Sequence, residues 1–314
     1  GVAGFIGCEV ALLLSKAGYS IVGIDNLNHY YDVSLKHARL KRLNGLVDFR
    51  EMDLVDKNSL NDLFKTEKFD AVVHLAAQAG VRYSLENPQA YVDSNVTGFL
   101  SILECCRENP VKHLVYASSS SVYGRNKKTP FSTEDPVCMP SSLYAATKRS
   151  NELMAETYSH LFKVNSTGLR FFTVYGPWGR PDMAPWLFAS SILDGKPIKV
   201  FNNGNMLRDF TYIADIAEGV VRVLENGLER APIHKLYNIG HGSPVNLMDF
   251  IAILENSLGI EAKKDFLPMQ PGDVEVTYAD TSALEKEVGY LANTDLETGV
   301  KAFAEWFKDY KNSI

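Results

Sequence analysis

Hydrophobic and polar positions in the first half of the chain alternate between two patterns. Short apolar runs, typical of buried strands, occupy Ile21–Asp25, Ala71–Leu75 and His113–Ser118. Helical periodicity covers Cys8–Ala17 and also Pro88–Arg107, where a proline stands in the first turn. This alternation predicts an α/β fold, in which a doubly wound parallel sheet is covered by helices on both faces.

The regular pattern fades after about residue 175. Ser142–Leu161 predicts one more strong helix and Ser166–Phe172 an extended segment, and prolines and glycines then crowd residues 176–185. We expect the chain to leave the first domain there and to form a smaller C-terminal substrate-binding domain. The first predicted domain covers residues 1–175, and the second covers mainly residues 176–314. Residues 214–240 are expected to return to the first domain as a helix (Ala214–Glu225) and a strand (Leu236–Ile239).

Composition narrows the classes of protein that fit this pattern. The chain is 46% hydrophobic, which suits a folded globular protein. Its net charge is −6, and acidic and basic residues are interspersed along the chain, which argues against a nucleic-acid partner. No apolar run approaches the roughly 20 residues that span a bilayer. The four cysteines have neither disulfide nor zinc spacing, so we predict no metal site and a reducing, cytoplasmic location.

Three glycines open the chain, as Gly1-Val-Ala-Gly4-Phe-Ile-Gly7. This spacing permits a tight turn and close approach of the backbone to a pyrophosphate at a helix N-terminus, as in a Rossmann dinucleotide site. Alone it also fits a glycine-rich surface turn. A phosphate loop springs from a sheet, so we expect a parallel strand before Gly1 in the natural protein.

A carboxylate ends the next predicted strand. Asp25 stands where an acid accepts hydrogen bonds from the adenosine ribose and repels a ribose phosphate, which favours NAD over NADP. The alternative is that Asp25 caps a turn with Asn26. Asp53 would reach the adenine edge, or else close a local turn.

Tyr144 and Lys148 lie four residues apart in a predicted helix, so both project from one face. We expect the ammonium to stabilise a phenolate and to lower the tyrosine pKa. The alternative is a solvated helix face. The run Ser118-Ser-Ser-Ser121 follows a buried strand, where parallel sheets place their ligands, although it also fits a simple turn.

These motifs together resemble the extended short-chain dehydrogenase/reductase family of nucleotide-sugar enzymes. The resemblance rests on the glycine loop, His74-Leu-Ala-Ala77, the serine run, Tyr144-Ala-Ala-Thr-Lys148 and Arg208-Asp-Phe-Thr-Tyr212. Residues 28–36 and 171–183 resemble the UDP-glucuronate 4-epimerase branch, although related sugar-epimerase branches share parts of both. The resemblance implies NAD as cofactor, a UDP-sugar substrate, and a homodimer paired through the tyrosine-bearing helices.

The resemblance also assigns roles to residues. It implies that Tyr144 is the catalytic base and acid, Lys148 its electrostatic partner, and Ser119 the hydroxyl that bridges to the sugar. The implied cofactor residues are Gly1, Gly4, Phe5, Ile6, Gly7, Asp25, Asn26, Asp53, Leu54, Leu75, Ala76, Ala77, Asn95, Tyr144 and Lys148. The implied substrate residues are Arg82, Ser119, Ser120, Ser121, Thr173, Arg180, Arg208 and Asp273.

The implied reaction is reversible 4-epimerisation of UDP-glucuronate to UDP-galacturonate through a 4-keto intermediate, with transient reduction of bound NAD. Arg180 is our candidate to clamp the sugar carboxylate, and an exposed arginine without a ligand is the alternative. Another UDP-hexose 4-epimerase, a UDP-glucuronate decarboxylase and a silent NAD-binding sensor remain as other functions. Serines at 119–121, where dehydratases and decarboxylases of the family carry acids, disfavour those two reactions.

Overall fold

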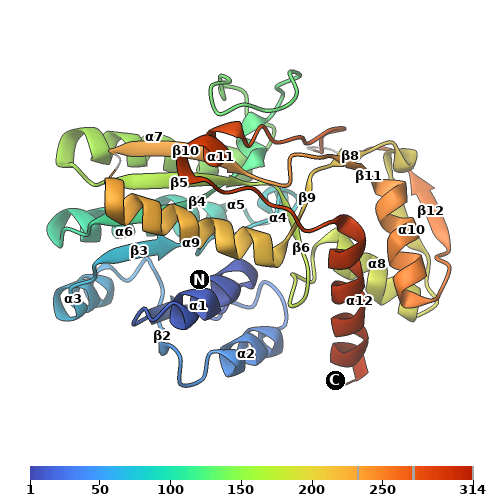
Figure 1. Cartoon of the computed structure of the whole chain (residues 1–314), viewed down its shortest axis with the longest axis horizontal. Coiled ribbons are helices and arrows are strands. Elements are labelled where there is room, and N and C mark those ends of the chain that lie inside the picture. Colours follow the sequence, from blue (N-terminus) through green and yellow to red (C-terminus); the bar gives the residue numbers. More distant parts are fainter. Residues whose placement is uncertain (232, 271–272, 313–314) are drawn as a thin grey trace.

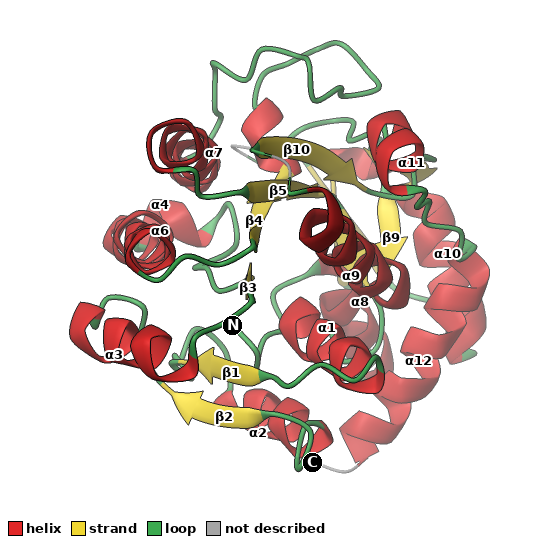
Figure 2. Cartoon of the chain, turned by 60° about the vertical axis from the view of Figure 1, so that its left-hand side comes forward, coloured by secondary structure: helices red, strands yellow, loops and turns green. Residues whose placement is uncertain are grey.

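Parallel strands form the centre of the computed structural model, which describes residues 1–231, 233–270 and 273–312. One sheet has the order β10-β5-β4-β3, and a parallel pair, β1-β2, lies beyond β3 (Figure 2). The strands are β1 Val22–Asp25, β2 Asp48–Glu51, β3 Ala71–His74, β4 His113–Ser119, β5 Ser166–Phe171, β6 Thr173–Tyr175, β7 Ile198–Phe201, β8 Leu207–Arg208, β9 Phe210–Tyr212, β10 His234–Ile239, β11 Val245–Asn246 and β12 Lys264–Leu267.

Helices cover both faces of this sheet. Figure 2 shows α3, α6 and α7 on one side and α1 and α9 on the other. The helices are α1 Phe5–Lys16, α2 Val33–Arg42, α3 Lys57–Glu67, α4 Tyr83–Glu86, α5 Pro88–Tyr91, α6 Gly98–Glu108, α7 Leu143–Phe162, α8 Ala184–Leu193, α9 Ile213–Arg230, α10 Leu247–Leu258, α11 Ser282–Val288 and α12 Leu296–Asn312. The predicted doubly wound α/β class is confirmed.

The predicted strands and helices agree with the structure to within a few residues, with one difference. The single helix expected over Pro88–Arg107 is divided, because a π-helical stretch, Val92–Thr97, separates α5 from α6. This wider turn carries Asn95, whose buried amide holds the backbone of Gln78 in the loop after β3. The π-helical turn thus occurs where the Asn95 side chain has to reach a neighbouring loop.

A second hydrophobic core lies beside the ends of the parallel strands, among α8, α10 and α12 (Figure 1). We propose a division of the chain at 175/176, because Tyr175 and the apolar side chains that follow it pack in this core. Residues 214–240 return to the first unit in this proposal, because β10 pairs with β5 and α9 packs on α1.

A buried ion pair joins α7 to the sheet. Arg170 donates to both carboxylate oxygens of Glu152, at 2.8 and 2.9 Å, and the side chains are 1% and 0% exposed. Ser118 and Arg149 also donate to this carboxylate. Burial acts to raise the pKa of Glu152, but Arg170 and the other donors bring it below its ordinary value.

Glu152→Gln is therefore expected to lower the free energy of unfolding at neutral pH by about 3–5 kcal/mol, because Arg170 loses its buried counter-ion. The folded-state pKa of Glu152 is depressed, so its contribution is present above the unfolded pKa and is lost as pH falls through the folded one. Denaturant unfolding should show a difference from wild type that narrows in acid. The control is Glu218→Gln, because Glu218 forms an exposed ion pair with Arg222. Equal losses of stability in the two variants would contradict the predicted role of the buried pair.

Candidate active site

A cavity of about 1090 Å³ lies at the carboxyl ends of the parallel strands, where open α/β sheets bind ligands. Its wall includes residues of the glycine loop, of the segments after β1, β3 and β4, of α7, and of the second hydrophobic core. The predicted site residues that line it are Gly1, Gly4, Phe5, Ile6, Gly7, Asp25, Asn26, Asp53, Leu54, Leu75, Ala76, Ala77, Arg82, Ser119, Ser120, Ser121, Tyr144, Lys148, Thr173, Arg180, Arg208 and Asp273.

The glycine loop has the geometry that a dinucleotide needs. A methyl group on Gly1 would come within 2.5 Å of the Ala76 amide, one on Gly4 within 2.9 Å of the Gly1 carbonyl, and one on Gly7 would overlap that carbonyl. The helix α1 begins at Phe5, so its free N–H groups lie at this turn. A bare backbone turn at a helix N-terminus, open to the cavity, fits a pyrophosphate.

Asp25 lies in the cavity wall and is 7% exposed. Its carboxylate accepts hydrogen bonds from the backbone N–H groups of Ala3 (3.2 Å) and Leu27 (3.0 Å), and Lys36 Nζ lies 3.5 Å away. Burial acts to raise the pKa of Asp25, while the charge of Lys36 and the hydrogen bond from the Leu27 N–H act to lower it. Asp25 therefore fixes the glycine loop and closes its own turn, while its contact with the adenosine ribose stays a prediction.

Asp25→Ser is expected to weaken NAD binding and to relax the discrimination against NADP, because the charge that opposes a ribose phosphate is removed. Cofactor titration of refolded apoprotein measures both effects. Asp48→Ser serves as the control, since it removes a carboxylate that is 57% exposed and pairs with Arg50 outside the cavity wall. An Asp25→Ser protein with unchanged cofactor preference would leave Asp25 with its structural role alone.

Two of the predicted cofactor residues have evident structural partners. Asp53 accepts from Asn26 Nδ2 at 2.8 Å and from Val55 N at 3.1 Å, the local turn that the sequence left open. Asn95 lies behind the cavity wall and is 1% exposed, and its amide also donates to Thr147 at 3.0 Å. Asn95 thus supports the loop at Gln78, and its contact with the cofactor stays a prediction.

The predicted catalytic residues come together at the ends of β4 and α7. Burial raises the pKa of Tyr144, while a hydrogen bond with Ser119 and the positive charge of Arg180 act in the opposite direction. Lys148 Nζ instead donates to the Ala117 carbonyl at 2.9 Å, and burial lowers the pKa of Lys148 to about 8. Lys148 is not among the groups that shift the pKa of Tyr144 in this structure, so the predicted stabilisation of a phenolate by Lys148 stays a prediction.

The predicted arginines differ in how their guanidinium groups are used. Arg208 donates to the Asp273 carboxylate at 2.9 Å and to the carbonyls of Val274 and Glu275, so it fixes this segment. The predicted grip of Arg208 on a diphosphate must compete with these bonds. Arg82 has no ion pair within the described residues, and its guanidinium lies over the ring of Phe201, 5.2 Å from the centroid. Arg82 is thus the better placed of the two for an anionic ligand.

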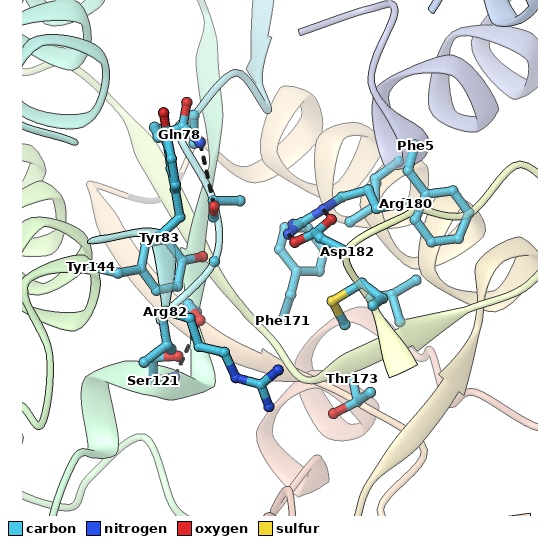
Figure 3. Close-up of a pocket in the computed structure, with 18 of the residues that line it drawn as sticks. Phe5, Gln78, Arg82, Tyr83, Ser121, Tyr144, Phe171, Thr173, Arg180 and Asp182 are labelled. Carbon is cyan, nitrogen blue, oxygen red and sulfur yellow. Dashed lines mark hydrogen bonds and ion pairs between the residues drawn. The ribbon is translucent and has the colours of Figure 1, made fainter. Parts of the chain in front are cut away.

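Arg180 faces Tyr144 and Tyr83 across the cavity (Figure 3). It forms a bidentate pair with Asp182, which also accepts a hydrogen bond from Tyr30 at 3.1 Å. Neither Asp182 nor Tyr30 was among the predicted site residues, although both lie in the two stretches that carry the resemblance. Neither residue stands in a local sequence pattern that marks a site, and the two residues meet only in the folded chain.

Comparisons with known proteins agree with this geometry. Residues 1–240 match the NAD dependent epimerase/dehydratase family. The chain is 48% identical to UDP-glucuronate 4-epimerase 4 of Arabidopsis thaliana, over 99% of this chain and 74% of that protein. Protein CapI of Staphylococcus aureus is 49% identical, over 99% and 97% of the two chains.

A similar solved structure is that of UDP-glucuronic acid 4-epimerase from Bacillus cereus, in complex with UDP-glucuronic acid and NAD. It matches with a TM-score of 0.92 and 34% identity, over 99% of this chain and 98% of that one. From the family match and these relatives, the chain belongs to the NAD-dependent epimerase/dehydratase family.

Proposed function

We propose that this protein is an NAD-dependent enzyme that interconverts UDP-glucuronate and UDP-galacturonate by inverting carbon 4 of the sugar. The observation that carries the proposal is the likeness to UDP-glucuronate 4-epimerases over 99% of the chain, at 46–48% identity for the Arabidopsis enzymes. The cavity adds its support, because the side chains of Tyr144, Ser119 and Arg180 all line it.

The chain's own residues would manage the proton and the position of the sugar. Bound NAD supplies a hydride acceptor that returns the hydride to the same carbon, so the cofactor is regenerated in each cycle. The glycine loop and Asp25 would hold the dinucleotide, and Lys148 would contact its ribose. Tyr144 would take the proton of the 4-hydroxyl and give it back after the sugar has turned over.

Tyr144 must act as both base and acid in this scheme. Its buried position raises its pKa and favours the protonated, acid form. The hydrogen bond with Ser119 and the charge of Arg180 favour the phenolate, which is the base. Ser119 would also bridge to the sugar hydroxyl, with Ser120 and Ser121 close by in the cavity wall.

The substrate's negative charges require cationic partners. Arg82 would meet the diphosphate, because its guanidinium has no carboxylate partner within the described part of the chain. Arg180 would meet the uronate carboxylate, together with the hydroxyl of Thr173 in the same wall. Arg208 and Asp273 would shape the nucleotide end of the cavity.

A turnover assay with a panel of UDP-sugars tests the proposal. We expect UDP-glucuronate and UDP-galacturonate to be interconverted, and UDP-glucose to be a much poorer substrate. Preferential turnover of a neutral UDP-hexose would establish that the protein is another 4-epimerase. UDP-pentose as the main product would establish a decarboxylase, and the absence of turnover with any UDP-sugar would favour an NAD-binding sensor.

We also propose that the protein is a cytoplasmic homodimer. The apolar side chains of Leu153 and Leu161 on α7 are 53% and 59% exposed, which supports pairing through this helix. All four cysteines have free thiols, as a reducing compartment favours. No helix in the described ranges is long and apolar enough to cross a membrane.

A further inference from the structure

The guanidinium of Arg180 is bound along one edge and free along another. Nε donates to Asp182 Oδ1 at 3.0 Å and Nη2 donates to Asp182 Oδ2 at 2.5 Å, so the side edge is filled. No protein partner of Nη1 occurs among the described residues. The side chains of Arg180 and Asp182 are 23% and 25% exposed, in the wall of the cavity.

Asp182 is itself fixed from a distant part of the sequence. Tyr30, in the loop after β1, donates its hydroxyl to Asp182 Oδ2 at 3.1 Å. The Tyr30 ring packs on Tyr83 with centroids 4.7 Å apart, which limits its rotation. Gly80 leaves the room for this contact, since a methyl group there would lie 3.0 Å from the Tyr30 hydroxyl.

We propose that Asp182, held by Tyr30, is a positioning residue that fixes the plane of the Arg180 guanidinium so that its free edge holds the sugar carboxylate in one orientation. This inference rests on the proposed function and names what controls the fate of its intermediate. Asp182 and Tyr30 act through Arg180 and need no contact with the reacting atoms.

The orientation matters because oxidation at carbon 4 makes a β-keto acid. In its decarboxylation the bond between carbon 5 and the carboxylate carbon breaks, carbon dioxide leaves, and the electron pair forms an enolate with the ketone. A proton then adds to carbon 5, and the resulting UDP-4-keto-pentose is released or takes back the hydride removed in the first step, which gives a UDP-pentose. The breaking bond must align with the π-system of the ketone, so a carboxylate held out of alignment is protected.

Asp182 affects the strength of substrate binding and the orientation of the Arg180 guanidinium in different ways. Asp182 partly cancels the charge of Arg180, which weakens the attraction for an anionic substrate. It also removes rotational freedom, because two parallel hydrogen bonds fix a planar guanidinium. Loss of Asp182 should therefore leave affinity for UDP-glucuronate unchanged or improved while carboxylate control is lost. Loss of Arg180 should damage both.

The test uses Tyr30→Phe and Asp182→Asn in the full-length protein, with UDP-glucuronate as substrate and UDP-pentose measured by mass spectrometry. Tyr30→Phe removes one oxygen atom and keeps the ring. Its pentose fraction should rise about tenfold, the usual effect of losing a hydrogen bond to a charged group. Asp182→Asn should raise it at least as much, with KM for UDP-glucuronate unchanged or lower.

The matched control is Tyr237→Phe, which removes a hydroxyl that donates to Glu287 at 2.8 Å, outside the cavity wall. Pentose fractions in Tyr30→Phe no higher than in this control would overturn the inference, whatever Asp182→Asn does. A rise in KM with Asp182→Asn would overturn it too, since Asp182 would then support binding and not orientation. If the wild-type protein makes no UDP-galacturonate, the proposed function itself has failed.

Discussion

Replacing Tyr144 with phenylalanine is expected to lower turnover of UDP-glucuronate by about 10²–10⁴-fold, because this change removes the group that moves the proton. NAD should remain bound, since the glycine loop and Asp25 are untouched. Steady-state turnover and the NAD content of the purified variant are the two measurements.

The control for this prediction is Tyr158→Phe on the same helix. The Tyr158 hydroxyl donates to Glu104 at 2.5 Å, outside the cavity wall, so its loss should leave turnover near that of wild type. Comparable activity in the Tyr144→Phe protein would remove Tyr144 from the mechanism. Loss of NAD together with activity would point to a structural role instead.

Replacing Arg180 with alanine is expected to have the second large effect. The variant loses the cation proposed to hold the uronate and leaves the half-buried Asp182 carboxylate to repel it. We expect KM for UDP-glucuronate to rise about tenfold or more, as for loss of a hydrogen bond to a charged group. The fraction of UDP-pentose or released keto-pentose should rise as well.

The double variant Arg180→Ala/Asp182→Ala separates the two causes of weak binding. If the unpaired carboxylate contributes, the double variant should recover part of the affinity but retain the raised pentose fraction. Binding of UDP-glucose should change little in either protein, because it has no carboxylate. Normal epimerisation without pentose in Arg180→Ala would show that Arg180 is not the clamp.

The parallel sheet and the closeness of Tyr144, Lys148 and Ser119 were predictable because both follow from local patterns. Tyr144 and Lys148 share a face by helical spacing, and Ser119 follows a buried strand at the edge where such sheets bind ligands. The influence of Arg180 on Tyr144 was not predictable in the same way. Arg180 comes from a distant loop, and its positive charge acts to lower the pKa of Tyr144, while Lys148 donates to the Ala117 carbonyl.

The uses of the arginines depended on contacts between remote segments. Arg208 and Arg180 appeared as free cations in the sequence, yet each is bonded to an aspartate, Asp273 or Asp182. Likewise, the support that Asn95 gives to the loop after β3 appears only once the π-helical stretch Val92–Thr97 lies beside that loop. All but one of the site residues predicted from the sequence line the cavity, but the sequence did not show which of their polar groups remain free for a ligand.

The most direct test of the proposed reaction is nuclear magnetic resonance of the purified protein incubated with UDP-glucuronate and no added cofactor. Because the hydride returns to the carbon that lost it, tightly bound NAD suffices and no second substrate is required. We predict that the signals of UDP-galacturonate appear and grow to a constant ratio with those of UDP-glucuronate. If the spectrum stays unchanged in a protein shown to contain NAD, the epimerase assignment is contradicted.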